Sequence, residues 1–138
     1  MKPFPLLLMS IFALATSSFA GGPSISVTVA PQTVTNEGEE ATLTFTLSAP
    51  ASRKIAMSFF LSGGASLGSD YVLIGNFNKS GQLIIPAGQT SVTVTLYTLV
   101  EDIEDGGGIE LAALDILDGP RYRVGSPSQA IVHIHNLK

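Results

Sequence analysis

A strict alternation of apolar and small polar residues is the feature that most constrains the fold of this chain. One such run has threonine between successive apolar residues, which are Ala41, Leu43, Phe45 and Leu47. Similar runs occupy residues 25–29, 55–61, 83–85, 92–97 and 130–135. Successive side chains of a β-strand point to opposite sides of a sheet, so this period predicts strands with one buried and one solvated face.

One segment, residues 109–116, fits two interpretations. Its apolar residues match a helical stripe as well as a strand, and they are Ile109, Ala112, Ala113 and Ile116. Three glycines precede the segment, an Asp-Gly-Pro turn follows it, and predicted strands lie on both sides. We therefore predict a strand here, with a bulge near Ala113 to explain the change of apolar phase.

The short runs, separated by turn residues, predict an all-β fold. We expect an immunoglobulin-like antiparallel β-sandwich of about seven strands with Greek-key connections. Apolar types make up 45% of the chain and charged types 13%, which excludes disorder driven by charge. Cysteine is absent, which excludes a disulfide-stapled domain and a thiolate zinc site. We expect residues 21–138 to form a single domain that a hydrophobic core alone can stabilise.

The first twenty residues have the order of a secretory signal peptide. Lys2 supplies a positive start, an apolar run extends from Phe4 through Ala15, and Ser18-Phe19-Ala20 provides a small-residue exit. This run is short for a membrane span. We expect residues 1–20 to be removed, leaving an exported chain with no transmembrane segment that is extracellular, bound at the cell surface or periplasmic.

Charge and motif content argue against two broad functions, nucleic-acid binding and catalysis. The net charge is −4 and the chain has only seven lysine and arginine residues, which makes a nucleic acid an unsuitable partner. No Gly-x-Ser-x-Gly motif and no cysteine occur, and both histidines lie close to the C-terminus. The sequence therefore predicts that the protein is not an enzyme.

Six turn signals in a fixed order give the chain a more specific resemblance. They are Asn36-Glu37-Gly38, the segment 45–50, the segment 63–71 ending in Gly-Ser-Asp-Tyr, the segment 85–90, the acidic segment 101–105, and the segment 122–130. In this order they resemble the Calx-beta domain, a sandwich module of sodium/calcium exchangers, integrin-type receptors and many bacterial surface proteins. The resemblance covers nearly all of residues 24–136.

The resemblance implies a calcium (Ca²⁺) site at one end of the sandwich, where carboxylates from several loops meet. Calcium is a hard cation that takes six to eight oxygen ligands. The residues of this chain at the family's ligand positions are Glu37, Asp70, Glu101, Asp102 and Glu104. We therefore expect these five carboxylates to be the metal ligands.

The chain departs from the family pattern in two places. Val100 occupies the position of the first aspartate in the acidic turn, and Gly106-Gly107-Gly108 replace further acids. The chain ends in Asn136-Leu137-Lys138, where the family has an aspartate-rich end. Because the affinity of oxygen sites depends on the number of charged ligands, these departures predict weaker calcium binding than in the family.

Two functions therefore remain open, and a third, a small hydrolase or polysaccharide-active enzyme, would require a polar cluster in a cleft. In the first, the chain is an exported, non-catalytic module in which calcium orders the loops for a protein or glycan partner, in adhesion, in the matrix or at the cell surface. In the second, the acidic loops are a solvated remnant and the protein associates without metal through its sheet edges or faces. Phe60, on the otherwise polar side of the run 55–61, favours the second.

His133 and His135 form a separate candidate site. They are two residues apart on a predicted strand, so both rings project from one face and can approach a transition metal. Metal sites in proteins usually have three or four ligands, and the alternative is a plain exposed strand face.

Overall fold

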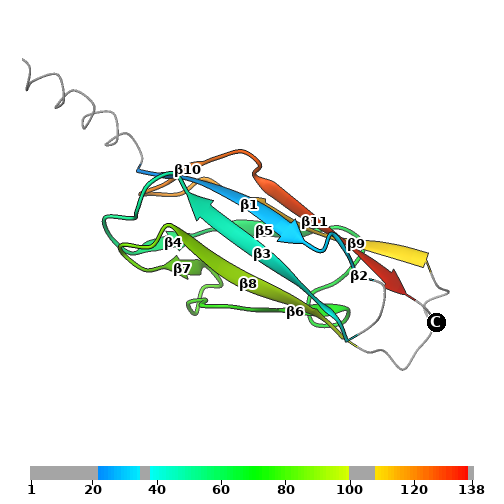
Figure 1. Cartoon of the computed structure of the whole chain (residues 1–138). Helices are drawn as coiled ribbons and strands as arrows, with labels where there is room; N and C mark the ends of the chain where they lie inside the picture. Colours follow the sequence, from blue (N-terminus) through cyan, green and yellow to red (C-terminus); the bar gives the residue numbers. More distant parts are fainter. Residues whose placement is uncertain (1–21, 35–37, 100–107, 137–138) are drawn as a thin grey trace, which may run out of the picture.

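The computed structural model describes residues 22–34, 38–99 and 108–136, and these form two β-sheets packed face to face (Figure 1). The five-stranded sheet has the order β10 (Arg123–Val124), β1 (Ser24–Ala30), β3 (Glu40–Leu47), β8 (Ser91–Thr98) and β6 (Tyr71–Ile74). The four-stranded sheet has the order β2 (Thr33–Val34), β11 (Gln129–Asn136), β9 (Gly108–Ile116) and β5 (Phe59–Ser62). A small third sheet pairs β4 (Ile55–Met57) with β7 (Leu83–Ile85).

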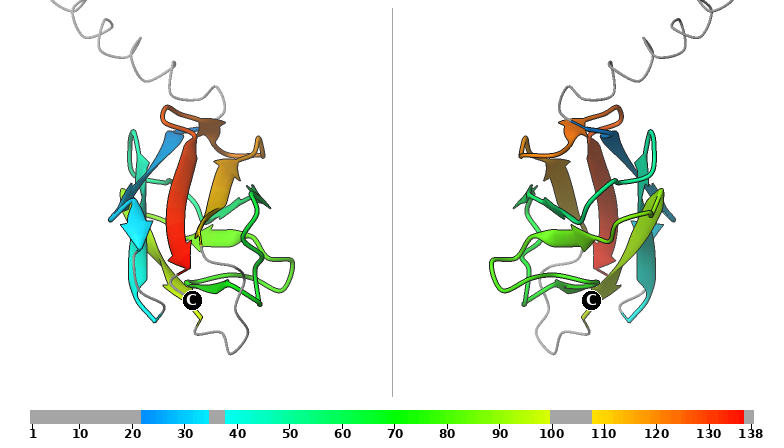
Figure 2. Two further views of the ribbon diagram at one scale, coloured as in Figure 1. Left: turned by 90° about the vertical axis from the view of Figure 1, so that its right-hand side faces the viewer. Right: turned by 90° about the vertical axis from the view of Figure 1, so that its left-hand side faces the viewer.

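The predicted all-β sandwich is confirmed, and its two layers are separate when the molecule is viewed from its end (Figure 2). Strands β5 and β6 lie in different sheets, as do β8 and β9, so the chain crosses between sheets instead of forming successive hairpins. None of the segments that the structure describes forms a helix of the length and apolarity that crossing a bilayer requires.

The apolar inner faces of the two sheets form the core. All of the following side chains are at most 7% exposed: Ile25, Val27, Leu43, Phe45, Val94 and Leu96 from the five-stranded sheet, and Ala112, Leu114, Ile116, Ala130, Val132 and Ile134 from the four-stranded sheet. They are the inward members of the alternating runs. Removing this apolar surface from water is the main favourable contribution to folding.

The number and direction of the strands differ from the prediction. The described residues form eleven strands where about seven were predicted, because the run 55–61 breaks at Ser58 and because three short strands, β2, β6 and β10, were not predicted. The Ser58 amide leaves the strand ladder and donates a hydrogen bond to the Tyr122 hydroxyl at 3.1 Å, and this hydroxyl donates to the Leu117 carbonyl. Two short edge pairs, β1 with β10 and β2 with β11, are parallel, so the sheets are not wholly antiparallel.

Strand β9 confirms the strand predicted at residues 109–116 but has no bulge. Its pairing with β11 runs without interruption from Asp115, opposite Gln129, to Gly108, opposite Asn136. Its pairing with β5 is also continuous. The apolar phase changes near Ala113 because β9 carries apolar side chains on its outer as well as its inner face, not because a residue is inserted.

The two outer faces of the sandwich differ in chemistry. On the five-stranded sheet, hydroxyl side chains line up across neighbouring strands in two rows, which are Ser26, Thr46 and Ser91, and Thr28, Thr44 and Thr93. On the four-stranded sheet, the exposed fractions of Phe60, Ile109 and Leu111 are 56%, 55% and 39%. Neither face is uniform, because the five-stranded sheet also exposes Ile74 and Tyr97 and the four-stranded sheet also carries polar side chains such as Asp115.

Gly63 lets the loop after β5 lie against β9. Its φ is +103°, in the region that favours glycine, and a Cβ at this position would come within 2.2 Å of the Leu111 carbonyl oxygen. Two residues on, the Ala65 amide donates a hydrogen bond of 3.0 Å to that same oxygen. Any side chain at Gly63 would separate the loop from β9.

We expect Gly63→Ala to destabilise the protein by more than about 1 kcal/mol, because the new methyl group meets backbone in a strained conformation. Gly64→Ala is the matched control, since a Cβ at Gly64 has no atom within 4 Å. Urea unfolding of both variants measures the difference. Equal stability of the two variants would contradict the close approach of Gly63 to β9.

Candidate functional site

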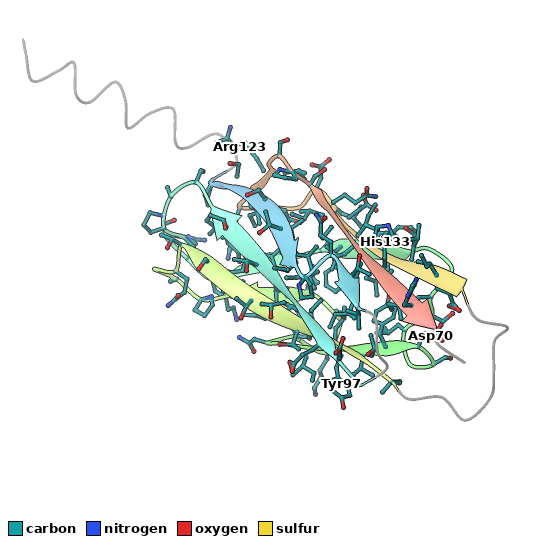
Figure 3. The ribbon with its side chains drawn as sticks, turned by 45° about the vertical axis from the view of Figure 1, so that its right-hand side comes forward. Asp70, Tyr97, Arg123 and His133 are labelled. Atoms are coloured by element: carbon teal, nitrogen blue, oxygen red, sulfur yellow. The ribbon has the colours of Figure 1, made fainter. Side chains whose placement is uncertain are left out.

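One end of the sandwich gathers segments that are far apart in the sequence. Strands β3, β6 and β9 begin here, and β8 and β11 end here, as the register shows by pairing Glu40 with Tyr97, Tyr71 with Thr98, and Gly108 with Asn136. We call the described part of this end, residues 38–40, 66–71 and 98–99, the pole. Asp70 lies in it (Figure 3).

Thr98 ties two of these segments together. Its side chain is fully buried at the end of β8, although it is polar. The Gly38 amide donates hydrogen bonds to the Thr98 carbonyl oxygen at 3.2 Å and to Oγ1 at 3.0 Å. The Thr98 amide and Oγ1 both donate to the Glu39 carbonyl oxygen, at 2.9 and 2.8 Å. Because a buried hydroxyl must be paired, these bonds specify how residues 38–39 lie on β8.

Asp70 joins the third segment to the same end. Its carbonyl oxygen accepts a hydrogen bond from the Leu99 amide at 2.9 Å, next to Thr98. Asp70 is half-buried, and its Oδ2 atom accepts a hydrogen bond of 2.7 Å from the Ser66 amide. In return, the Asp70 amide donates a hydrogen bond of 2.8 Å to the Ser66 carbonyl oxygen. The turn of residues 66–70 therefore holds the Asp70 carboxylate in place.

Tyr71 packs beneath this turn and is only 1% exposed. Burial raises the pKa of its phenol above the ordinary value of 10.0, and the neighbouring Asp70 carboxylate raises it further. Both causes disfavour the phenolate, because one removes water and the other adds a like charge. The phenol of the folded protein therefore stays neutral at a pH where an unfolded chain would lose the proton.

Only one of the five predicted metal ligands falls in the described structure. Asp70 is at the pole, as predicted, and the other four, which are Glu37, Glu101, Asp102 and Glu104, lie outside the described residues. Within the described ranges, no three histidine, aspartate or glutamate side chains come close enough together to hold a metal ion.

His133 and His135 are both on the outer face of β11, as predicted, with Val132 and Ile134 facing the core. The Nδ1 atom of His133 lies 3.3 Å from the Gln32 carbonyl oxygen, which belongs to the chain just before β2. No third ligand joins the two rings among the residues that the structure places. The observed geometry is that of a partly exposed strand face.

Two grooves run beside the sheets, one apolar and one of mixed lining. A groove of about 330 Å³ lies between the edge strands β5 and β6, and its lining includes Phe59, Leu61 and Phe77. Another, of about 380 Å³, lies along β1 and β11 and includes Val29, Ile131 and His133. Neither lining contains a carboxylate, so neither supplies an acid and base pair for catalysis.

Sequence reasoning did not identify Thr98 as a positioning residue. The signal was present, because Thr98 continues the inward phase of Val92, Val94 and Leu96 and therefore places a hydroxyl where an apolar side chain is expected. A polar residue at an inward position usually marks a specific buried hydrogen bond.

Solved structures of Calx domains superpose on this chain. The crystal structure of the apo form of the Calx CBD1 domain matches with a TM-score of 0.55 and 19% identity, over 80% of this chain and 96% of that chain. The protein has the Calx-beta fold. The resemblance predicted from the order of the turn signals is confirmed at this level.

Two further structures agree with this assignment of the Calx-beta fold. They are CBD12 from CALX1.2 and the calcium binding domain CBD12 of CALX1.1, each with a TM-score of 0.54 and 19% identity. The matches cover 80% and 78% of this chain, which spans 44% and 43% of those longer chains. No protein-family model and no curated protein matches the sequence.

Thr98→Val keeps the shape of the side chain and removes its hydroxyl, so we expect a loss of about 1 to 2 kcal/mol of unfolding free energy. Thr93→Val makes the same change on the exposed face of the same strand, where we expect almost no loss. Chemical denaturation compares the two variants. If both are equally stable, Thr98 does not hold the pole together.

The raised pKa of Tyr71 predicts a loss of stability at high pH. The contribution is fully present below the unfolded pKa of about 10 and is lost as pH rises toward the folded pKa, because only the unfolded chain then releases the proton. We expect Tyr71→Phe to flatten this loss and Tyr97→Phe, at an exposed position, to leave it unchanged. Unfolding curves between about pH 8 and 11 provide the measurement, and an unaltered slope in Tyr71→Phe contradicts the assignment.

Proposed function

We propose that the protein is an exported, non-catalytic Calx-beta module that binds calcium at its pole. The observation that supports this function is the set of hydrogen bonds joining residues 38–39, Asp70 and residues 98–99. Glu37 directly precedes Gly38 in the sequence, and Glu101 follows Leu99 by two residues. Gly38 and Leu99, which are close in sequence to these acidic residues, therefore lie at the same end of the sandwich as Asp70.

We assign the calcium ligands to Glu37, Asp70, Glu101, Asp102 and Glu104. The chemistry suits this cation, because carboxylate oxygens are the ligands that calcium prefers. The Ser66 amide holds one oxygen of Asp70, which orients the carboxylate before an ion arrives. The name of one similar structure, the calcium binding domain CBD12 of CALX1.1, supports calcium as the bound ion.

Bound calcium would order the loops of the pole. Clustered carboxylates repel one another without a cation, and an ion that neutralises them lowers the cost of holding the loops in one arrangement. A preordered polar surface then binds a protein or glycan partner with less loss of entropy. We propose adhesion, the matrix or the cell surface as the setting, with residues 1–20 as the export signal.

A non-catalytic role agrees with the surfaces of the described residues. The linings of the two grooves described above contain no carboxylate. The solved structures that share the fold are named as Calx CBD domains, and one of them as a calcium binding domain. A binding module needs only the ordered loops of the pole, whereas a hydrolase would need an acid and base in a cleft.

Calcium should raise the thermal unfolding midpoint of the protein relative to EDTA. A site filled at about a hundred times its dissociation constant adds roughly 2.7 kcal/mol, which is a shift of several degrees. Asp70→Asn should abolish the shift, because it removes the charge and keeps an oxygen acceptor for the Ser66 amide. Differential scanning calorimetry measures both proteins.

Asp115→Asn is the matched control, since Asp115 lies on β9 and pairs with Gln129 and Phe60, away from the pole. We expect this variant to keep the full calcium shift. An identical midpoint of the unsubstituted protein in EDTA and in millimolar calcium would refute calcium binding. A shift that survives Asp70→Asn would move the ion away from the pole.

A further inference from the structure

The end of the sandwich opposite the pole carries basic side chains that are far apart in the sequence. Arg53 and Lys54 lie on the segment after β3, Arg121 and Arg123 follow β9, and both strands run away from the pole. All four residues are exposed. We call this set, Arg53, Lys54, Arg121 and Arg123, the basic end. Figure 3 shows Arg123 and Asp70 at opposite ends of the sandwich.

Hydrogen bonds to backbone carbonyls hold the basic end together. The Nη1 atom of Arg121 donates to the Lys54 carbonyl oxygen at 3.4 Å, and the Nε atom of Arg123 donates to the Gly22 carbonyl oxygen at 3.1 Å. Gly22 also lies against Arg121, because a Cβ at Gly22 would come within 2.2 Å of the Arg121 carbonyl oxygen. The described chain therefore begins at the basic end.

The described structure gives the cations of the basic end no carboxylate partner. None of the four forms an ion pair with any residue that the structure places. Asp115 and Asp118, at the end of β9, are close to them in the sequence, and Asp115 instead accepts hydrogen bonds from Gln129. A positively charged surface that the protein does not neutralise itself is available to an anionic partner.

Acidic residues gather at the other end of the sandwich. Glu39, Glu40 and Asp70 lie at the pole, and Glu110 lies near it on β9, two residues from Gly108. The domain therefore has charges of opposite sign at its two ends, while the net charge of the chain is −4. Such a distribution orients a protein in the field of a charged surface. The basic end turns toward a negative surface, and the pole turns away from it.

The sequence before Gly22 favours a membrane as this surface. The apolar run from Phe4 through Ala15, which we propose as part of the export signal, is the segment suited to enter a bilayer. Gly22 follows Ala15 by seven residues, which span at most about 25 Å. A membrane that holds this run therefore lies within reach of the basic end, so export would deliver the basic end next to a membrane surface.

We propose that the basic end binds the anionic phosphate headgroups of a membrane surface and so presents the pole to the surrounding solution. Guanidinium groups pair with phosphate through two parallel N–H donors, and lysine adds a point charge. Each basic residue near an anionic leaflet strengthens binding about fivefold. The contact deepens the proposed cell-surface setting and rests on it, whereas calcium takes no part in it.

Co-sedimentation with lipid vesicles tests the proposal. The protein purified after expression of the full chain is mixed, in EDTA, with vesicles of phosphatidylglycerol and phosphatidylcholine or with vesicles of phosphatidylcholine alone. We expect tighter binding to the vesicles that contain phosphatidylglycerol, and we expect high salt to remove this preference. EDTA prevents calcium from bridging the acidic pole to the headgroups.

Lys54→Gln should weaken binding to the anionic vesicles about fivefold, and adding Arg53→Gln should weaken it by a similar factor again. Neither side chain forms a hydrogen bond with the residues that the structure describes, so these substitutions leave the fold intact. Lys79→Gln is the matched control, because it removes the same charge from a turn whose Gly81 lines one groove with Gly68 of the pole. This variant should bind like the unsubstituted protein.

Equal affinity for anionic and neutral vesicles overturns the proposal. An equal effect of Lys54→Gln and Lys79→Gln overturns it as well, since only the net charge would then matter. Binding that inorganic phosphate abolishes at matched ionic strength indicates a site for one free phosphate group and contradicts a surface contact. Retention on heparin without a preference for anionic vesicles assigns the basic end to an acidic glycan, which also overturns the proposal.

The vesicle experiment and the calcium experiment fail independently. Vesicle binding in EDTA does not report on calcium, and the calcium shift of the unfolding midpoint is measured without lipid. A protein that shows the calcium shift but no preference for anionic vesicles therefore loses only the membrane contact. A protein with the opposite behaviour loses only the calcium site.

Discussion

The packing of two apolar inner faces against each other is the interaction on which the rest of this structure depends. The chain has no cysteine, so no disulfide limits the unfolded state. Side chains such as Phe45 and Leu114 come from different sheets and meet in one core. Their removal from water offsets the conformational entropy that the ordered chain loses. The ends of the strands then determine where each loop begins.

The pole shows how a core of this kind positions a polar site. Apolar packing is not directional, so it does not by itself specify how one loop lies on another. Thr98 specifies how residues 38–39 lie on β8, because its buried hydroxyl and its backbone form hydrogen bonds of defined geometry with them. Asp70 is attached next to it through the Leu99 amide. The proposed calcium site therefore rests on a few polar contacts at the edge of the core.

The sandwich presents three chemically distinct surfaces with one short chain. The pole carries a positioned carboxylate, the outer face of the five-stranded sheet carries rows of hydroxyls, and the outer face of the four-stranded sheet carries exposed apolar side chains among polar ones. Because alternate side chains of a strand point in opposite directions, outer residues can vary without changing the core.

The sequence by itself determined the fold class, the inward residues and the identity of β9, because the two-residue period is a local property of each strand. Through the family's turn motif it also predicted that Asp70 lies at one end of the sandwich. It did not determine the break at Ser58, the continuous register of β9 or the parallel edge pairs. The break depends on Tyr122, which is 64 residues from Ser58 in the sequence. That Asp70, Gly38 and Thr98 share one end was likewise decided by the tertiary structure, because register and sheet crossing bring together residues that no local pattern connects.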